Sequence, residues 1–267
     1  MKLEDAAKFT GSIPDNYDRF LGPHIFHGFA DDLADRVSPL PSATLLELAA
    51  GTGIVTARLL ERLPSGCRVT ASDLNLPMLE VARARLGSPE NVAFEIADAT
   101  ALPYGDASFD TVVCQFGVMF FPDKHKAYGE VRRVLSPGGH YLFNVWGSLE
   151  TNPFAHIANE VVTEMFPDDP PGFYKVPFSY HDVQVIEEDV VRAGFESVKV
   201  ESVEIESPII SANDFATGLV YGNPLFQEVT ARGGDPQEVV AIMASALAEA
   251  LGDKMPLQAL LIDARVA

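Results

Sequence analysis

Five short apolar runs alternate with helical patterns between residues 41 and 147, and this rhythm constrains the fold more than any other feature of the chain. Apolar runs without polar alternation are typical of strands that are covered on both faces of a sheet. Strands that alternate with helices indicate βαβ units and a parallel sheet. We therefore expect an α/β fold with a doubly wound sheet. The expected strands are Thr44–Leu48, Arg68–Ser72, Val92–Ile96, Asp110–Gln115 and His140–Trp146.

Helical patterns flank these strands. The patterns inside the core end at Leu63, Leu86 and Leu135, and a Ser-Pro-Gly-Gly run at 136–139 breaks the last of them. Before the first strand, apolar side chains at steps of four predict one stripe of an amphipathic helix. The members of that stripe are Ile25, Phe29, Leu33 and Val37.

The rhythm changes after Trp146. We expect helices at Pro153–Phe166, Asp182–Ala193, 212–222 and 235–251, and strands at Ser197–Glu206 and Leu257–Val266. A separate core of about 30–50 residues would be marginally stable. We therefore expect one domain over 1–267, in which 1–40, 148–181 and 207–255 form helical lids on a core at 41–147. The amphipathic helix at 235–251 is expected to pack within the chain, and a homodimer contact is the alternative.

Charge and composition exclude several classes of partner. The 267 residues include 19 basic and 38 acidic side chains, which gives a net charge of −19. This excess argues against duplex DNA or RNA and against an anionic membrane surface, because both need a basic face. A local pocket can still hold a nucleotide-like ligand.

The chain has two cysteines, Cys67 and Cys114, which is too few for a disulfide framework. It has no C-x-x-C or H-E-x-x-H pattern, so the sequence does not predict a metal site. No apolar run approaches the roughly 20 residues of a membrane span. Acidic residues stand where a signal peptide would have an apolar core. We expect a soluble, cytoplasmic protein.

The most informative segment is Thr44–Thr56, with the sequence TLLELAAGTGIVT. A strand that reaches Glu47 is followed by Ala49, Gly51 and Gly53 and then by a helix. Small residues let a ligand approach the backbone, and a new helix N-terminus offers free N–H groups. Ligands bind at this edge of doubly wound sheets. The segment predicts a nucleotide-binding turn, and a tight turn without a ligand is the alternative.

Two acidic residues follow the next two expected strands. Asp73 ends the second strand in the run ASDLN, and Asp98 follows the third in ADATALPYGDASFD. A carboxylate at the first position can accept hydrogen bonds from both hydroxyls of a ribose. One at the second can accept a bond from the exocyclic amine of adenine. Either acid alone is often a turn residue, but together with the glycine turn they predict a site for an adenosine-containing ligand.

Two other nucleotide motifs fit less well. The dinucleotide fingerprint G-x-G-x-x-G/A would fall on Gly51, Gly53 and Thr56, so its third position fails. A nicotinamide-dependent dehydrogenase would also leave Asp98 without a role. The P-loop pattern G-x-x-x-x-G-K-[ST] does not occur in the chain.

The runs LLELAAGTG, ASDLNLPML, ADATALPYGDASFD and RRVLSPGGHYLF occur in this order, and with them residues 41–147 resemble class I S-adenosylmethionine-dependent methyltransferases. The nearest resemblance is to small-molecule enzymes of the ubiquinone/menaquinone-biosynthesis type. It implies a Rossmann-like, mostly parallel seven-stranded sheet whose last strand is antiparallel. It also implies S-adenosylmethionine as cofactor, S-adenosylhomocysteine as product and no metal. Where the family often has a first glycine, this chain has Ala49.

The resemblance further implies which residues surround each part of the cofactor. The methionine part would contact Glu47, Ala49, Gly51 and Gly53. The adenosine part would contact Asp73, Leu74, Met78, Asp98 and the backbone of Ala99. The sulfonium end would lie beside Gln115 and Phe116. Tyr17 would approach the cofactor, and Phe26 is a further candidate there for which a core role is favoured. The four apolar members of these groups, Phe26, Leu74, Met78 and Phe116, can equally be core residues.

Methyl transfer from a sulfonium is an in-line displacement, and alignment of the reactants alone can supply on the order of 7–11 kcal/mol. We expect the acceptor pocket above the glycine loop, closed by Tyr17–Phe29, by Trp146–Tyr180 and by Ala212–Asn223 with Phe215 and Tyr221. The many Phe and Tyr residues of these segments favour a small apolar or aromatic acceptor over a sugar or a nucleic acid. Four histidines lie there, each more often structural than catalytic, and none is assigned as a base. They are His24, His27, His156 and His181.

Two classes of function remain open. One is transfer of a methyl group to an acceptor oxygen, carbon or nitrogen. The other is a non-catalytic S-adenosylmethionine-binding module or the partner of an active subunit. The space beside Gln115 and Phe116 discriminates between them, because an open pocket there supports an enzyme and aromatic rings that fill it support a module. A dehydrogenase is the third alternative.

Overall fold

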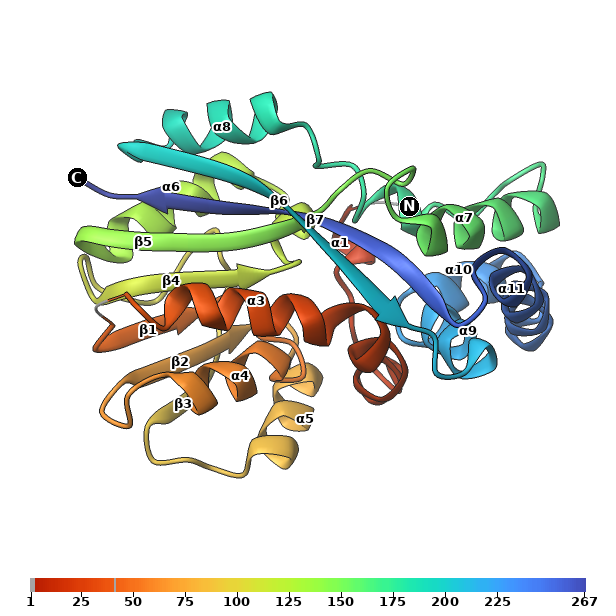
Figure 1. Cartoon of the computed structure of the whole chain (residues 1–267), viewed down its shortest axis with the longest axis horizontal. Helices are drawn as coiled ribbons and strands as arrows, with labels where there is room; N and C mark the ends of the chain where they lie inside the picture. The colour runs from red at the N-terminus through yellow and green to blue at the C-terminus, as the bar shows by residue number, and fades with distance from the viewer. Residues whose placement is uncertain (1–2, 41) are drawn as a thin grey trace.

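The computed structural model describes residues 3–40 and 42–267, arranged as one sheet with helices on both faces and a cluster of helices at one end (Figure 1). Residues 1, 2 and 41, which stand at the expected boundaries of the N-terminal lid and the core, lie outside the described residues.

Over the described residues the sheet has seven strands in the order β3-β2-β1-β4-β5-β7-β6. Strands β1 to β5 pair in parallel, and β7 lies antiparallel between β5 and β6. The expected mostly parallel sheet with an antiparallel last strand is therefore confirmed. The strands are β1 (Thr44–Glu47), β2 (Arg68–Asp73), β3 (Val92–Ile96), β4 (Phe109–Gln115), β5 (Leu135–Trp146), β6 (Ser197–Pro208) and β7 (Lys254–Arg265).

Helices cover both faces of this sheet (Figure 1). One face carries α3 (His27–Val37), α4 (Ile54–Arg62) and α5 (Leu76–Leu86), and the other carries α6 (Lys124–Val134) and α8 (Val183–Arg192). The central strands of such a sheet need apolar side chains on both faces, which explains the apolar runs of β1 and β4, whereas the edge strand β3 stays partly exposed.

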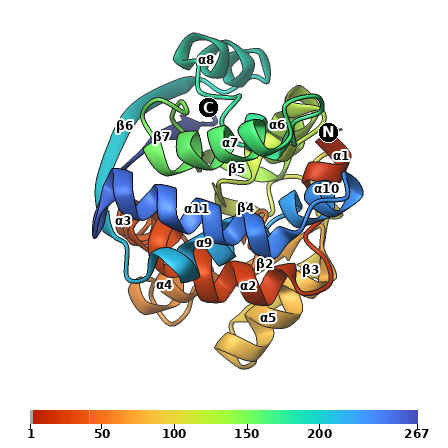
Figure 2. The same cartoon turned by 90° about the vertical axis from the view of Figure 1, so that its right-hand side faces the viewer.

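The remaining helices gather at the carboxyl ends of the parallel strands (Figure 2). They are α1 (Leu3–Ala6), α2 (Ile13–Asn16), η1 (Tyr17–Phe26), η2 (Val118–Phe120), α7 (Pro153–Met165), η3 (Phe173–Lys175), α9 (Ala212–Tyr221), α10 (Leu225–Ala231) and α11 (Pro236–Leu251). Segment η1 is a π-helix, and at its end the His27 N–H donates to the Gly22 carbonyl five residues earlier.

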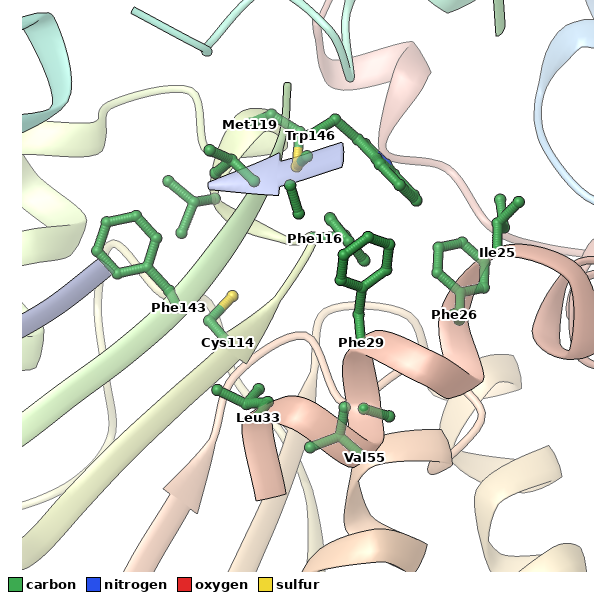
Figure 3. Packing of buried hydrophobic residues seen from close by; sticks show 14 of the residues in the cluster. Ile25, Phe26, Phe29, Leu33, Val55, Cys114, Phe116, Met119, Phe143 and Trp146 are labelled. Atoms are coloured by element: carbon green, nitrogen blue, oxygen red, sulfur yellow. The ribbon is translucent and has the colours of Figure 1, made fainter. Parts of the chain in front are cut away.

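The apolar stripe predicted before the first strand is buried along its whole length, but Ile25 belongs to η1 and only Phe29, Leu33 and Val37 lie in α3. Figure 3 shows Phe29 and Leu33 pointing from this helix into the core beside β4 and β5. The helix expected at 235–251 is observed as α11 and packs on α7 and α9, which lie beside it in Figure 2; Val239, Met243 and Leu247 are buried there, whereas Ile242 is exposed.

Two local expectations were wrong. The Ser-Pro-Gly-Gly run does not stand outside the sheet but lies within β5, which begins at Leu135. Leu135 pairs with Phe109 and His140 pairs with Thr111, so the run forms a bulge opposite a single residue, Asp110. Helix α10 was not among the expected helices. It has only seven residues, which is too short to show a clear apolar periodicity. No helix within 3–40 and 42–267 has the length and the hydropathy needed to cross a bilayer.

Candidate cofactor site and acceptor pocket

A cavity of about 1200 Å3, counted out to its mouth, opens at the carboxyl ends of the parallel strands. Ligands bind at this edge in doubly wound sheets. Most of the residues predicted for the site line it. They are Tyr17, Phe26, Ala49, Gly51, Asp73, Leu74, Met78, Asp98, Ala99, Gln115 and Phe116.

The glycine loop after β1 turns sharply through left-handed backbone conformations. Gly51 has φ +56° and Gly53 has φ +76°, which glycine adopts without steric cost. Ala49 has φ +51°, a conformation that side-chain-bearing residues rarely adopt. The departure of this chain from the family's usual first glycine therefore places an alanine in a strained position beside the cavity.

Two predicted residues, Glu47 and Gly53, are absent from the cavity wall as far as the chain is described. Gly53 is the N-cap residue just before α4, and a Cβ atom there would lie 3.0 Å from the Cβ of Ala82. Glycine at this position therefore lets α4 start close against α5. Glu47 is buried behind the loop, where its Oε2 accepts a hydrogen bond of 2.6 Å from the Thr56 hydroxyl. Burial raises the pKa of Glu47 to about 8, and the neighbouring Asp73 carboxylate adds to the increase.

Asp73 presents a carboxylate that is held by backbone amides and is only 7% exposed. Its Oδ2 accepts a hydrogen bond from the Gly51 N–H at 2.9 Å, and its Oδ1 accepts one from the Asn75 N–H at 2.8 Å. Each carboxylate oxygen has two acceptor positions, so capacity remains for hydroxyl groups of a ligand. Burial raises the pKa of Asp73, and the two backbone hydrogen bonds partly oppose this shift.

Leu74 and Asp98 form the outer part of the same wall. Leu74 is 58% exposed, although it is a large aliphatic side chain. Asp98 is exposed, and its Oδ1 accepts hydrogen bonds of 2.8 Å from both the N–H and the hydroxyl of Thr100. Asp98 therefore stabilises the turn through its Oδ1 atom. Its Oδ2 atom takes part in neither of these hydrogen bonds.

Gln115 and Phe116 stand where β4 ends. The Gln115 Nε2 lies 3.4 Å from the Phe26 carbonyl, and its Oε1 is closed off from solvent and accepts no hydrogen bond from the described residues. An amide oxygen that is buried without a partner costs about 1–3 kcal/mol. Phe116 has φ +50° and stacks on Trp146 with ring centroids 3.9 Å apart (both are labelled in Figure 3).

Aromatic side chains make up much of the cavity wall, and we call the part of the cavity that they line the acceptor half. They are Phe9, Tyr17, Phe26, Phe116, Phe120, Phe121, Trp146, Phe154, Phe173, Tyr174 and Phe178. Within the described chain no Lys, Arg or His lines the cavity, and its only acidic residues are Asp73 and Asp98. The Tyr174 hydroxyl and the Asn223 amide both donate to the Leu219 carbonyl at 2.8 Å. The acceptor half therefore carries no charged side chain, and its Tyr174 hydroxyl is hydrogen-bonded within the protein.

All three segments expected to close the pocket contribute to its wall, but not always with the expected residues. Phe215 is fully buried and stacks on His24 outside the wall, with centroids 4.8 Å apart. Tyr221 accepts a hydrogen bond from Gln237 and also lies outside it. Leu219 and Asn223 represent this segment instead.

Two parts of the wall were not predicted. One is the N-terminal segment with Ala7 and Phe9, and the other is the turn with Phe120, Phe121 and Pro122 after β4. The second carries a signal that the sequence offers, because aromatic residues directly after a parallel strand must lie at the ligand-binding edge.

None of the four histidines considered as bases lines the cavity in the described structure. His24 is buried, and burial lowers its pKa. Burial lowers the pKa of His27 as well, and Arg85 and Arg58 add to this effect. His156 and His181 are exposed. Over residues 3–40 and 42–267, no three His, Cys, Asp or Glu side chains are grouped in a way that would hold a metal ion.

Comparison with known sequences places the glycines of the loop and both acids inside one domain match. Residues 46–143 match the family model described as a methyltransferase domain. The demethylmenaquinone methyltransferase of Clavibacter sepedonicus is 45% identical over 106 residues, which cover 40% of this chain and 42% of that protein. The ubiquinone/menaquinone biosynthesis C-methyltransferase UbiE of Hahella chejuensis is 37% identical over 130 residues, which cover 48% and 52%. The chain thus spans about half the length of these relatives.

Comparison with solved structures extends the likeness to the whole fold. The phosphoethanolamine N-methyltransferase 2 of Haemonchus contortus, solved with S-adenosyl-L-methionine, superposes with a TM-score of 0.63 at 18% identity. The match covers 100% of this chain and 60% of that one. The chain therefore has the Rossmann-like fold seen in solved S-adenosylmethionine-dependent methyltransferases, and its residues 46–143 match a methyltransferase domain and are similar to enzymes of the ubiquinone/menaquinone-biosynthesis type.

Proposed function

We propose that this protein transfers a methyl group from S-adenosylmethionine to a small, uncharged, largely apolar or aromatic acceptor. One observation carries the proposal. One cavity joins a wall of loop backbone and carboxylates, suited to an adenosine-containing cation, to an acceptor half made of aromatic rings without charged side chains.

The cofactor half fits the cofactor in chemistry. Asp73 is a buried carboxylate in the cavity wall and would accept hydrogen bonds from the ribose hydroxyls. Leu74 offers an exposed aliphatic surface that the adenine ring would cover, and Asp98 would meet the adenine amine. The loop around Ala49 and Gly51 leaves room for the methionine part. When bound, the cofactor supplies a methyl group attached to a positively charged sulfur. After the transfer this sulfur is the leaving group, as a neutral thioether.

The acceptor half would orient a planar molecule and exclude water from it. The stacked pair of Phe116 and Trp146 forms a flat wall, and Phe26 lies 5.8 Å from Phe116 on another side. Aromatic rings recognise flat apolar molecules by stacking and by burial of apolar surface. Holding acceptor and methyl group in line is the main contribution that such a pocket makes to the rate.

The enzyme hypothesis is favoured over a binding module by the space beside Gln115 and Phe116. Both residues line the cavity together with Trp146, so the rings surround this space and do not occupy all of it. A module without catalysis remains the second candidate, because its cofactor half would be identical. A nicotinamide-dependent dehydrogenase has no support from the methyltransferase domain match.

The proposal is tested by incubating the protein with methyl-labelled S-adenosylmethionine and a panel of phenols, quinones and small organic acids. We expect label in the organic product of at least one apolar aromatic member and none with highly charged acids. Calorimetry with S-adenosylhomocysteine accompanies the assay. Binding without transfer to any member would favour the module, and no binding would contradict the whole proposal.

A further inference from the structure

The N-terminal strap, defined as residues 7–9, forms part of the cavity wall and contacts two other parts of it. Ala7 and Phe9 belong to the cavity wall, and the preceding Ala6 is fully buried. The Phe9 ring meets Tyr17 edge-on with centroids 5.9 Å apart, and it meets Phe120 in the same way at 5.9 Å. The strap therefore contacts both η1 and η2, the short helix that follows β4.

A single side chain, Asn75, fastens the strap at both ends. Its Oδ1 accepts a hydrogen bond from the Phe9 N–H at 3.3 Å, and its Nδ2 donates to the Ala7 carbonyl at 3.1 Å. Asn75 precedes the first residue of α5, where asparagine usually accepts hydrogen bonds from the first helical turn. In the described structure its side chain makes no such capping bond. The amide of Asn75 is thus directed to the strap and away from its own helix.

Asn75 also contacts Asp73, the carboxylate that is predicted to bind the ribose. Its backbone N–H donates to the Asp73 Oδ1 at 2.8 Å, and its Nδ2 lies 3.4 Å from the same oxygen. One amide group therefore connects the carboxylate to the strap. A ligand that engages Asp73 lies within the same cavity that Ala7 and Phe9 close.

We propose that Asn75 is a positioning residue that couples closure of the N-terminal strap to occupation of Asp73. The strap covers the bound cofactor, and the cofactor leaves when the hydrogen bonds of Asn75 to Ala7 and Phe9 break. This inference rests on the proposed function, because it takes the cavity to be the cofactor site.

The test measures S-adenosylhomocysteine release from the full chain by stopped flow and hydrogen exchange at the Phe9 amide. The variants are Asn75→Ala, which removes both hydrogen bonds, and Phe9→Ala, which leaves Asn75 and Asp73 untouched. Asn213→Ala, at an exposed asparagine outside the cavity, is the matched control. We expect release about tenfold faster in both strap variants, the effect of losing two neutral hydrogen bonds or one ring contact. The ligand should slow exchange at Phe9 in the wild type and in the control, but not in Asn75→Ala.

Three outcomes overturn the inference. Unchanged release rates in both strap variants would do so, even if their melting temperatures fell, because that pattern indicates a merely structural role. Exchange at Phe9 that is the same with and without the ligand would also do so. If the wild type does not bind S-adenosylhomocysteine at all, the proposed function fails as well, and this distinguishes the two failures.

Discussion

The Thr56 hydroxyl donates a 2.6 Å hydrogen bond to the buried carboxylate of Glu47, and this pair lies directly behind the glycine loop. Burial raises the pKa of Glu47 to about 8, whereas its value in an unfolded chain is 4.5. The folded state therefore binds this proton more tightly than the unfolded state. Its contribution to stability is complete below pH 4.5 and is lost as the pH rises through 8.

We expect the free energy of unfolding to fall between pH 5 and pH 8 in the wild type and to fall less steeply in Glu47→Gln. The difference is a few kcal/mol, at about 1.4 kcal/mol for each pKa unit. Urea unfolding across this range measures it, and Glu238→Gln, an exposed site on α11, is the control. Parallel curves for wild type and Glu47→Gln would show that Glu47 does not titrate in this range.

Asp73→Asn should weaken the binding of S-adenosylhomocysteine. The substitution removes the charge and one accepting oxygen, and charge-assisted hydrogen bonds are worth on the order of 1.5–3 kcal/mol, or about 10- to 150-fold in affinity. Isothermal calorimetry measures the change. Asp253→Asn, at an exposed acid outside the cavity, should bind as the wild type does. Equal affinity of both variants for S-adenosylhomocysteine would show that Asp73 does not bind the cofactor.

Trp146 is the only tryptophan of the chain, lines the cavity and is 4% exposed, so its emission reports on the acceptor half. We expect 4-nitrophenol to quench this emission with a saturable dependence on concentration, because the ligand would occupy the space beside the Phe116–Trp146 stack. Free N-acetyltryptophanamide gives the collisional control. Quenching of the protein that stays linear like the control would argue against a ligand in this half.

Gly117→Ala should destabilise the protein. A Cβ atom at this position would lie 2.5 Å from the Ala49 Cβ and 2.7 Å from the Cys114 Sγ, and such overpacking costs about 1–3 kcal/mol. Adding Ala49→Gly removes one of these contacts and also relieves the positive φ at Ala49. The double variant should therefore be more stable than the sum of the single changes predicts, as measured by urea unfolding. Simple additivity would show that the two sites do not collide.

Patterns within a few residues predicted the core of the fold. Buried parallel strands need apolar side chains on both faces, so a run such as Asp110–Gln115 is visible without any partner. The Ser-Pro-Gly-Gly run misled this reading, because pairing of Leu135 with Phe109 carries the strand through a strong local turn signal. Tertiary pairing here outweighs local propensity.

The site residues that directly follow strands could be predicted from the sequence. The residues that close the site from segments distant in the sequence could not. Asp73 and Asp98 come directly after strands, so their edge of the sheet is known from the sequence. Phe9 meets Phe120 across more than a hundred residues, and no spacing in the chain announces that contact. Phe215 is aromatic and lies in an expected lid, yet it packs on His24 beneath the surface. Aromatic content indicates a closing segment but does not distinguish its inner side from its outer side.

The π-helical winding of η1 decides which of its side chains can meet. Tyr17 and Phe26 stack with centroids 4.7 Å apart although they are nine positions apart in the chain. Nine residues of an α-helix make about 2.5 turns, which would put the two rings on opposite sides of the helix. Deleting one residue from this segment would let it tighten into an ordinary helix and separate the pair. The number of residues between Tyr17 and Phe26 is therefore as much a part of the pocket as their aromatic character.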